Sequence, residues 1–409
     1  MTAPSAADWA ARAQRLADLL AAQGDVHHPA WRSAVAAVPR HVFVPGAYRQ
    51  DDTGTWQPVD VTSPAGLDLV YSPTTLLTAL ADRGTHQESL PSSTKPDLML
   101  RMLEALDIHD GHKVLEIGTG TGYNAAVLSH RLGANLVFSV DVDTELVDSA
   151  RRRLHRIGFR PTLATADGAG GLPGHAPFDR IIATCSVPTV PWAWAEQLCV
   201  GGRILVDVKV APEAGNLVLL YRHPDRLEGR FTTRCGSFMT MRHHHEDAPA
   251  PPQPRSEHTR RRTTTIPPHP WWDHRVSRLL AQFQGLPAGV HIGMHLDPDT
   301  RQPTASFLSA PDGCWATVRL ISSRGHYDLI EGGPTALWDS VERAHQVWLE
   351  HEQPDWTRFG LTITRLPVMT CPPMDAVAPP VSGDGGTHLP LRRLPTRYRD
   401  AHISLTRSS

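Results

Sequence analysis

The stretch Val114-Leu115-Glu116-Ile117-Gly118-Thr119-Gly120-Thr121-Gly122 decides the fold of this chain. An aliphatic run leads into three glycines at alternate positions, which predicts a buried first strand of a parallel sheet, a tight turn and a helix over 123–131. Glycine suits such a turn because a Cβ would block a ligand lying against the backbone. The pattern predicts a nucleotide-type cofactor loop, and the alternative is an ordinary glycine-rich turn of another α/β protein.

The spacing of the glycines and two later acids indicate which cofactor binds. A dinucleotide fingerprint requires G-x-G-x-x-G, whereas this turn reads G-x-G-x-G after Glu116, and no P-loop Gly-Lys-Ser/Thr occurs. Asp141 ends a second apolar strand, where it would accept from ribose hydroxyls, and Asp167 follows a third, where it would accept from an adenine amino group. These features predict an S-adenosyl-L-methionine pocket, with S-adenosyl-L-homocysteine as product. The expected cofactor-binding residues are Glu116, Gly118, Thr119, Gly120, Gly122, Asp141, Val142, Asp167 and Gly168.

Composition excludes several classes of protein. The 409 residues carry a net charge of −2, with 20% charged and 40% hydrophobic residues, so no global charge indicates nucleic acid or a membrane as partner. No apolar run reaches the roughly 18 residues of a membrane span. The five cysteines are scattered, which fits a reducing, cytoplasmic setting and predicts no metal site. The run His243-His244-His245 reads as an exposed polar segment rather than a metal site.

Strands alternate with helices to about residue 222, which predicts a doubly wound parallel sheet. Seven prolines and four arginines between residues 246 and 270 predict a linker, because such a segment builds no core. From Trp271 onward the pattern changes to α+β. We therefore expect a Rossmann-like class I methyltransferase domain over 1–245, a linker over 246–270 and a C-terminal α+β domain over 271–409.

A hydroxyl-rich loop precedes the helix that begins at Pro96. The sequence Leu90-Pro91-Ser92-Ser93-Thr94-Lys95-Pro96 places three consecutive hydroxyls between two prolines. Clustered hydroxyls before a helix usually serve as caps, so a capping role and a functional role both remain open from the pattern alone.

Together these residues resemble the protein-L-isoaspartate O-methyltransferase family. The resemblance covers roughly residues 30–242 and is carried by Val-Pro-Arg-His-Val-Phe-Val-Pro at 38–45, a hydroxyl-x-Pro element before a Met-rich helix at 94–102, and Leu-Glu-Ile-Gly-Thr-Gly-Thr-Gly-Tyr at 115–123. It implies S-adenosylmethionine as donor and a peptide carboxylate as acceptor. Catalysis would then rest on alignment of oxygen, methyl carbon and sulfur. Ser93 and Thr94 are the candidate catalytic residues, with Ser92, Lys95 and Tyr71 as substrate-binding residues.

The departures from the family shape the functional hypothesis. Repair enzymes carry Ser-Gln-Pro where this chain has Thr94-Lys95-Pro96, and they are about half as long. The chain looks like the actinobacterial forms that methylate a normal aspartate in a lasso peptide, graspetide or lanthipeptide, whose ester closes to aspartimide and can hydrolyse to isoaspartate.

Our leading hypothesis is therefore an aspartyl O-methyltransferase acting on one ribosomal peptide, pre-constrained as a lasso or macrocycle. Trp271-Trp272 would help to line the groove that holds this peptide. General isoaspartate repair is the alternative, and a non-catalytic binding partner that retains the cofactor fold is a third. Assays on an isoaspartyl peptide and on a precursor peptide separate them.

Overall fold

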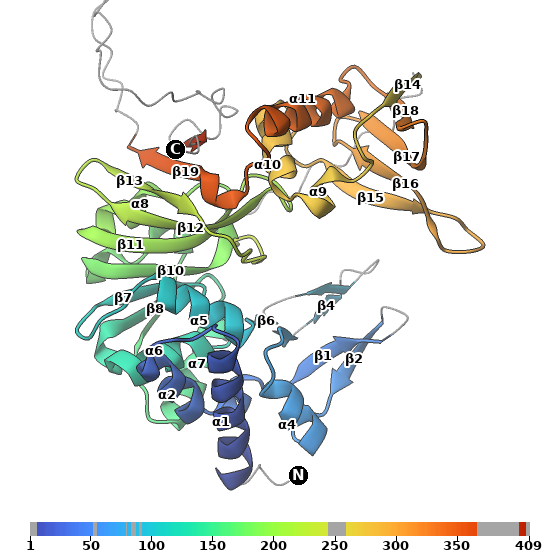
Figure 1. The fold of residues 1–409 in the computed structure, drawn as a ribbon. Helices are drawn as coiled ribbons and strands as arrows, with labels where there is room; N and C mark the ends of the chain where they lie inside the picture. The colour runs from blue at the N-terminus through green and yellow to red at the C-terminus, as the bar shows by residue number, and fades with distance from the viewer. Residues whose placement is uncertain are drawn as a thin grey trace, which may run out of the picture.

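The computed structural model describes residues 6–51, 55–78, 80–82, 87–89, 92–243, 259–365 and 401–405. A nine-stranded mixed sheet forms its centre (Figure 1). Its strands are β7 (Val114–Ile117), β8 (Val137–Asp141), β9 (Thr162–Thr165), β10 (Phe178–Val187), β11 (Leu198–Lys209), β12 (Gly215–Arg222), β13 (Arg226–Phe231), β19 (Phe359–Thr364) and β20 (Ala401–Leu405). Their order in space is β20-β19-β13-β12-β11-β10-β7-β8-β9.

The sheet has a parallel half and an antiparallel half. Strands β7 to β11 pair in parallel, and β12, β13, β19 and β20 extend the sheet in antiparallel pairs. The first parallel strand, β7, lies between β8 and β10, so the strand order reverses at β7. In open α/β sheets a ligand binds outside the carboxyl ends of the strands at this reversal.

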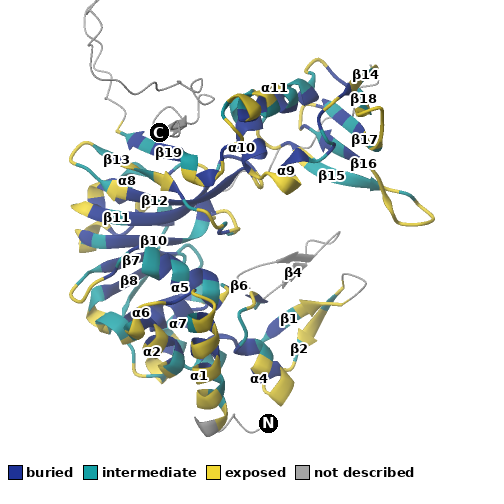
Figure 2. Ribbon diagram, in the orientation of Figure 1, coloured by how far each residue is buried: buried dark blue, intermediate teal, exposed yellow. Residues whose placement is uncertain are grey.

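Helices cover both faces of the parallel half, which explains why β7, β8 and most of β10 are buried. All four residues of β7 are buried, with Leu115 and Ile117 in one hydrophobic cluster and Val114 in the other. Figure 2 shows the central strands buried. The helices of this part are α1 (Ala6–Ala22), α2 (Pro29–Ala37), α3 (Arg40–Phe43), α4 (Pro64–Val70), α5 (Pro96–Ala105), α6 (Tyr123–Leu132), α7 (Thr144–Arg156) and α8 (Trp192–Gln197). Short 3-10 helices are η1 (Ala134–Leu136), η2 (Gly168–Gly170), η3 (Pro173–His175) and η4 (Trp356–Arg358).

A small four-stranded sheet, ordered β2-β1-β3-β6, precedes the central sheet in the sequence. It consists of β1 (Ala47–Gln50), β2 (Trp56–Val59), β3 (Leu76–Leu77) and β6 (Ser92–Ser93), beside a hairpin of β4 (Leu80–Asp82) and β5 (Gln87–Ser89). Backbone pairing sets Leu76 opposite Ser93, so β3 fixes the position of the hydroxyl-rich segment.

The second large unit is a five-stranded antiparallel sheet ordered β14-β18-β17-β16-β15, packed against two helices. It projects from the same side of the molecule as β1 and β2 in Figure 1. Its buried side chains continue the hydrophobic cluster of the central sheet without a break. The elements are β14 (Thr259–Thr264), α9 (Pro270–Asp273), α10 (Val276–Phe283), β15 (His291–Leu296), β16 (Pro303–Ser309), β17 (Trp315–Ser323), β18 (His326–Gly332) and α11 (Leu337–Glu350).

Two predicted domain limits need correction. Residues 259–264 were expected in the linker, but they form β14, because Arg262 pairs with Glu331, Asp339 and Glu342 and the strand pairs with β18. Residues after 358 were expected to complete the C-terminal domain. Strands β19 and β20 belong instead to the central sheet, where β19 pairs with β13. The first part of the predicted linker, 246–258, lies outside the described residues.

The groove-lining role predicted for Trp271-Trp272 stays a prediction, and the structure separates the two side chains. Both lie in the short helix α9, where successive side chains point in different directions. Trp271 is buried and packs edge-on against Trp338 at 6.1 Å between ring centroids. Trp272 is 54% exposed and stacks on His269. Trp338 and Trp348, both on α11, are also buried.

Candidate functional site

The glycine turn joins β7 to α6 as predicted, and its conformation explains the glycines. Gly118, Gly120 and Gly122 have φ values of 97°, 52° and 88°, a region that disfavours side chains. A Cβ on Gly118 would lie 2.8 Å from Oγ1 of Thr184 on β10, and one on Gly122 would lie 2.9 Å from Cβ of Ala150 on α7. The turn is thus held between the ends of neighbouring elements at the strand-order reversal.

Glu116 lies beneath the turn rather than at its surface. Its side chain is 1% exposed, and its two carboxylate oxygens accept from Asn124 Nδ2 at 2.7 Å and from Ser139 Oγ at 2.6 Å. The Thr119 hydroxyl lies 2.7 Å from that of Ser139. Burial raises the pKa of Glu116 to about 7. The predicted contact of Glu116 with the cofactor stays a prediction. In the structure its carboxylate joins β7 to β8 and α6 beneath the turn.

Asp141 meets the turn at the carboxyl end of β8. Its Oδ2 accepts from the backbone amide of Gly120 at 3.0 Å, and its Oδ1 accepts from the amide of Asp143 at 3.2 Å. Both Asp141 and the following Val142 are half-buried. The two predicted cofactor-binding elements, turn and acid, are therefore adjacent, and the carboxylate keeps lone pairs beyond these two bonds.

Asp167 and Gly168 follow β9 and reach the same edge of the sheet. The backbone amide of Ala169 donates to Oδ1 of Asp167 at 2.9 Å. A Cβ on Gly168 would lie 2.7 Å from Cγ2 of Ile117, the last residue of β7, so only glycine allows this approach. Turn, Asp141 and Asp167 thus come together along the carboxyl ends of β7, β8 and β9.

A segment that the sequence reasoning missed, residues 238–243, crosses this edge. The amide of Phe238 donates to Asp207 on β11, and Ser186 on β10 exchanges backbone bonds with Met239 and Met241. His243 Nδ1 lies 2.9 Å from Oδ2 of Asp167. The histidine run was predicted to be an exposed polar segment rather than a metal site, and His244 and His245 lie outside the described residues. Among the residues that the structure describes, no group of three or more His, Cys, Asp or Glu forms a metal site.

The predicted acceptor residues divide by exposure. Ser93 is 2% exposed, Thr94 is half-buried and Lys95 is exposed at the cap of α5. The backbone of Ser92 lies in β6, whereas its side chain lies outside the described residues. Tyr71 is buried, its hydroxyl is 2.7 Å from His41 Nδ1, and burial raises its pKa.

The residue that unites these segments is Arg40, which the sequence reasoning quoted only as part of a motif. Its guanidinium is fully buried and donates to the carbonyl oxygens of Val70, Ser72, Thr74 and Thr94. The sequence offered one signal for this role, a basic residue between Pro39 and a short apolar run. An arginine that is buried there has to donate to several acceptors.

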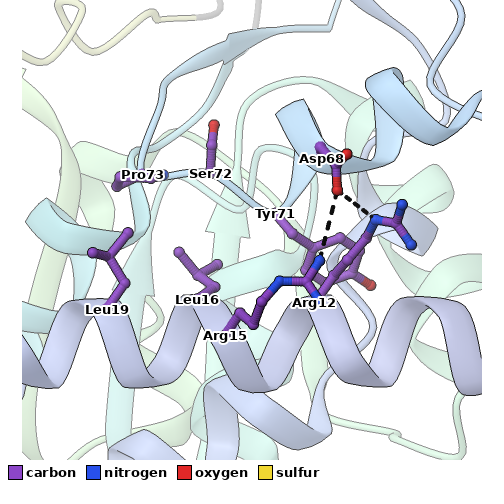
Figure 3. Close-up of a pocket in the computed structure, with 8 residues that line it drawn as sticks. All are labelled: Arg12, Arg15, Leu16, Leu19, Asp68, Tyr71, Ser72 and Pro73. Atoms are coloured by element: carbon purple, nitrogen blue, oxygen red, sulfur yellow. Dashed lines mark hydrogen bonds and ion pairs between the residues drawn. The ribbon is translucent and has the colours of Figure 1, made fainter.

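A pocket of about 220 Å³ lies between α1 and the residues around Tyr71 (Figure 3). One wall carries Arg12 and Arg15, which pair with Asp68 at 2.7 and 3.7 Å. None of its lining residues belongs to the glycine turn or its acids, so this pocket is separate from the predicted cofactor edge. Its lining residues are Arg12, Arg15, Leu16, Leu19, Asp68, Tyr71, Ser72 and Pro73.

Fold and site together define a Rossmann-like class I S-adenosylmethionine-dependent methyltransferase with an added α+β unit. The family model "Protein-L-isoaspartate(D-aspartate) O-methyltransferase (PCMT)" matches residues 11–235, more than half of the chain. The chain therefore belongs to this family. The described residues contain no helix long and apolar enough to span a membrane.

Curated relatives agree with this assignment. The chain is 35% identical over 193 residues to protein-L-isoaspartate O-methyltransferase of Gloeobacter violaceus, covering 47% of this chain and 80% of the relative. It is 38% identical over 180 residues to the enzyme of Xanthobacter autotrophicus, covering 42% and 80%. A solved protein-L-isoaspartate O-methyltransferase aligns with a TM-score of 0.49 at 21% identity, over 86% of this chain and 96% of that one.

Proposed function

We propose that this protein transfers a methyl group from S-adenosylmethionine to the free α-carboxylate of L-isoaspartyl residues in peptides and proteins. The observation that carries the proposal is the family match over 11–235, which includes both the glycine turn and the Ser93–Thr94 segment. General isoaspartate methylation thereby replaces peptide tailoring as the leading hypothesis.

On the cofactor side, each residue has a role that its position supports. Asp141 accepts from the ribose hydroxyls, because it ends the strand next to the turn. Asp167 accepts from the adenine amino group. The bound donor supplies an electrophilic sulfonium methyl, and the backbone of Gly118–Gly122 forms the surface against which it lies. Glu116 acts indirectly, by holding the base of the turn to β8 and α6.

On the acceptor side, alignment is the main requirement, because a carboxylate is already a nucleophile. One carboxylate oxygen forms a bond to the methyl carbon as the carbon–sulfur bond breaks, giving a methyl ester and S-adenosylhomocysteine, and no proton has to move. Hydroxyl donors suit this step, since they orient a carboxylate without neutralising it as an arginine partner would. Ser93 and the more accessible Thr94 carry this role, with Lys95 placed to attract acidic peptides.

A second acceptor, a normal aspartate in a pre-constrained ribosomal peptide, is supported by one feature. The five-stranded unit begins at residue 259, beyond the family match that ends at 235. Recognition of one aspartate among many draws on contacts remote from the reacting group, and this unit would supply them.

The test compares three peptides with the full-length enzyme and S-adenosylmethionine. One carries isoaspartate, one carries aspartate in the same sequence, and one carries aspartate within a macrocycle. Mass spectrometry of the methyl ester and measurement of S-adenosylhomocysteine give the rates. We expect the isoaspartyl peptide to react at least about a hundredfold faster than the other two, corresponding to about 3 kcal/mol. Preferential methylation of the macrocyclic aspartate would overturn the proposal in favour of peptide tailoring.

A further inference from the structure

Arg40 is a buried cation that donates mainly to backbone carbonyl oxygens. Its side chain is 0% exposed, and within the described ranges no Asp or Glu oxygen lies within ion-pair distance of its guanidinium. Burial lowers its pKa to about 10, so the group remains protonated at neutral pH. A charge held in this way needs several hydrogen-bond acceptors, and where those acceptors lie tells us what the charge does.

The two terminal nitrogens of Arg40 together bind two separate segments, residues 70–74 and residues 93–94. Nη1 donates to the carbonyls of Val70 at 2.6 Å and Ser72 at 2.9 Å. Nη2 donates to the carbonyl of Thr74 at 3.1 Å, to that of Thr94 at 3.4 Å and to Oγ of Ser93 at 3.5 Å. The first segment begins at the last residue of α4, and its residues 71–73 line the pocket in Figure 3. The second segment is the acceptor segment.

The same guanidinium faces the cofactor side. Its central carbon lies 5.7 Å from the ring centroid of Tyr123, the first residue of α6 and the neighbour of Gly122. Phe43, which ends α3, packs on the same ring at 5.8 Å. Arg40 therefore lies between the glycine turn and the segment that carries Ser93 and Thr94.

One consequence concerns the hydroxyl of Ser93. Because an N–H of Arg40 donates to Ser93 Oγ, that oxygen acts as acceptor toward the arginine, and its own proton is directed to another acceptor. A cation behind the hydroxyl also makes it a stronger donor, since charge-assisted bonds polarise their neighbours. A carboxylate is the acceptor that gains most from such a donor.

We propose that Arg40 is a positioning residue for the methyl acceptor: it fixes Ser93 and Thr94 relative to the glycine turn and directs the Ser93 proton toward the substrate carboxylate. This inference rests on the proposed carboxylate methylation and assigns it a residue that acts through Ser93. Arginine is required because its planar fork reaches two segments at once, whereas the single nitrogen of lysine reaches one.

The chain offers a matched control in Arg180 of β10. Arg180 is 7% exposed and also donates to backbone carbonyls, those of Leu106 at 2.7 Å and Asp107 at 3.0 Å. These acceptors lie at the amino end of the sheet, away from the glycine turn. Arg180→Lys therefore removes comparable buried bonds without touching the acceptor segment.

The experiment compares Arg40→Lys with Arg180→Lys. For Arg40→Lys we expect the KM for an isoaspartyl peptide to rise at least tenfold and kcat to fall at least tenfold, while the Kd for S-adenosylhomocysteine, measured by calorimetry, changes less than twofold. Arg180→Lys should keep all three values within twofold, even where it lowers the melting temperature. Kinetics for Arg40→Lys that match those of Arg180→Lys would overturn the proposal.

Two further measurements keep the proposal testable in every case. If Arg40→Lys fails to fold, Ser93→Ala replaces it. This variant should raise the KM for the isoaspartyl peptide at least fivefold and leave S-adenosylhomocysteine binding unchanged. An unchanged KM would overturn the proposal that Arg40 acts through Ser93. If the wild-type enzyme methylates no isoaspartyl peptide, the proposed function has failed. Hydrogen exchange then decides on Arg40: faster exchange over residues 70–77 and 92–95, but not over 114–122, supports it, and unchanged exchange overturns it.

Discussion

The two edges of the parallel sheet use aspartates in different ways. At the amino edge, Asp107 pairs with Arg203 at 3.0 Å, and Asp110 pairs with Arg131. At the carboxyl edge, Asp141 accepts from backbone amides, and Asp167 accepts from a backbone amide and lies beside the imidazole of His243. Arginine partners neutralise an acid, whereas amide partners orient it and leave its charge for a ligand.

The difference separates structural acids from ligand-binding acids within one sheet. Exposed ion pairs contribute little to stability, typically below about 1 kcal/mol. An acid that is oriented by backbone amides at the strand-order reversal contributes instead to binding. Substitutions at the carboxyl edge should therefore change affinity, and those at the amino edge should change little.

The largest expected effect is that of Asp141→Ala. Loss of the acceptor for both ribose hydroxyls should weaken S-adenosylhomocysteine binding at least a hundredfold, about 3 kcal/mol, because hydrogen bonds to a charged group contribute about 1.5–3 kcal/mol each. Calorimetry measures the affinity. The matched amino-edge variant is Asp107→Asn, which tolerates the positive φ of 51° at that position. Equal losses of affinity in both variants would remove the distinction between the edges.

The next effect is a pH dependence that arises from Glu116. Its pKa rises from an ordinary 4.5 to about 7, mainly through burial. The stability that protonated Glu116 contributes is fully present below about pH 4.5 and is lost as the pH rises through about 7, because the unfolded state releases the proton first. The loss amounts to about 3 kcal/mol.

Glu116→Gln should remove this loss. Urea unfolding at about pH 5 and about pH 8 measures the free energy of unfolding. The control is Glu145→Gln, on the exposed side of α7, which should show the same change with pH as the wild-type protein. If the wild-type protein and Glu116→Gln show the same change in the free energy of unfolding between the two pH values, the Glu116 carboxylate is ionised throughout.

The smallest expected effect concerns His243. Its removal takes one partner from Asp167, so His243→Ala should weaken S-adenosylhomocysteine binding about fivefold, or about 1 kcal/mol. His243→Asn keeps a donor near the position of Nδ1 and should restore most of the affinity. Tighter binding by His243→Ala would contradict this role, since it would mean that the imidazole competes with adenine for the carboxylate.

Much of the catalytic fold was predictable from sequence, because local patterns determined it. The strand, turn and helix around Gly118–Gly122 and the later acids at strand ends follow from apolar periodicity and glycine spacing. The observed fold class and the cofactor agree with the prediction. The positions of Asp141 and Asp167 beside the turn follow from the rule that parallel strands share one carboxyl edge.

The remainder depended on contacts distant in sequence. Nothing local to Glu116 shows that Asn124 and Ser139 occupy its oxygens, and nothing local to Arg40 shows that its acceptors lie at 70–74 and 93–94. The Pro/Arg-rich composition before Trp271 concealed β14, because Arg262, one of the arginines of the predicted linker, is paired with acids from β18 and α11. Pairwise contacts of this kind override composition.

The pairing of β13 with β19 has a practical consequence for dissecting the protein. The five-stranded unit is an insertion, because the chain returns after it to the central sheet as β19. It therefore cannot be removed by truncating the chain without also removing β19. A chain that stopped near residue 245 would leave β13 as an edge strand with unpaired amides and carbonyls, the kind of surface that recruits other chains. Such a fragment would report on aggregation rather than on peptide choice, and substitutions within 259–332 are the cleaner way to ask what the unit recognises.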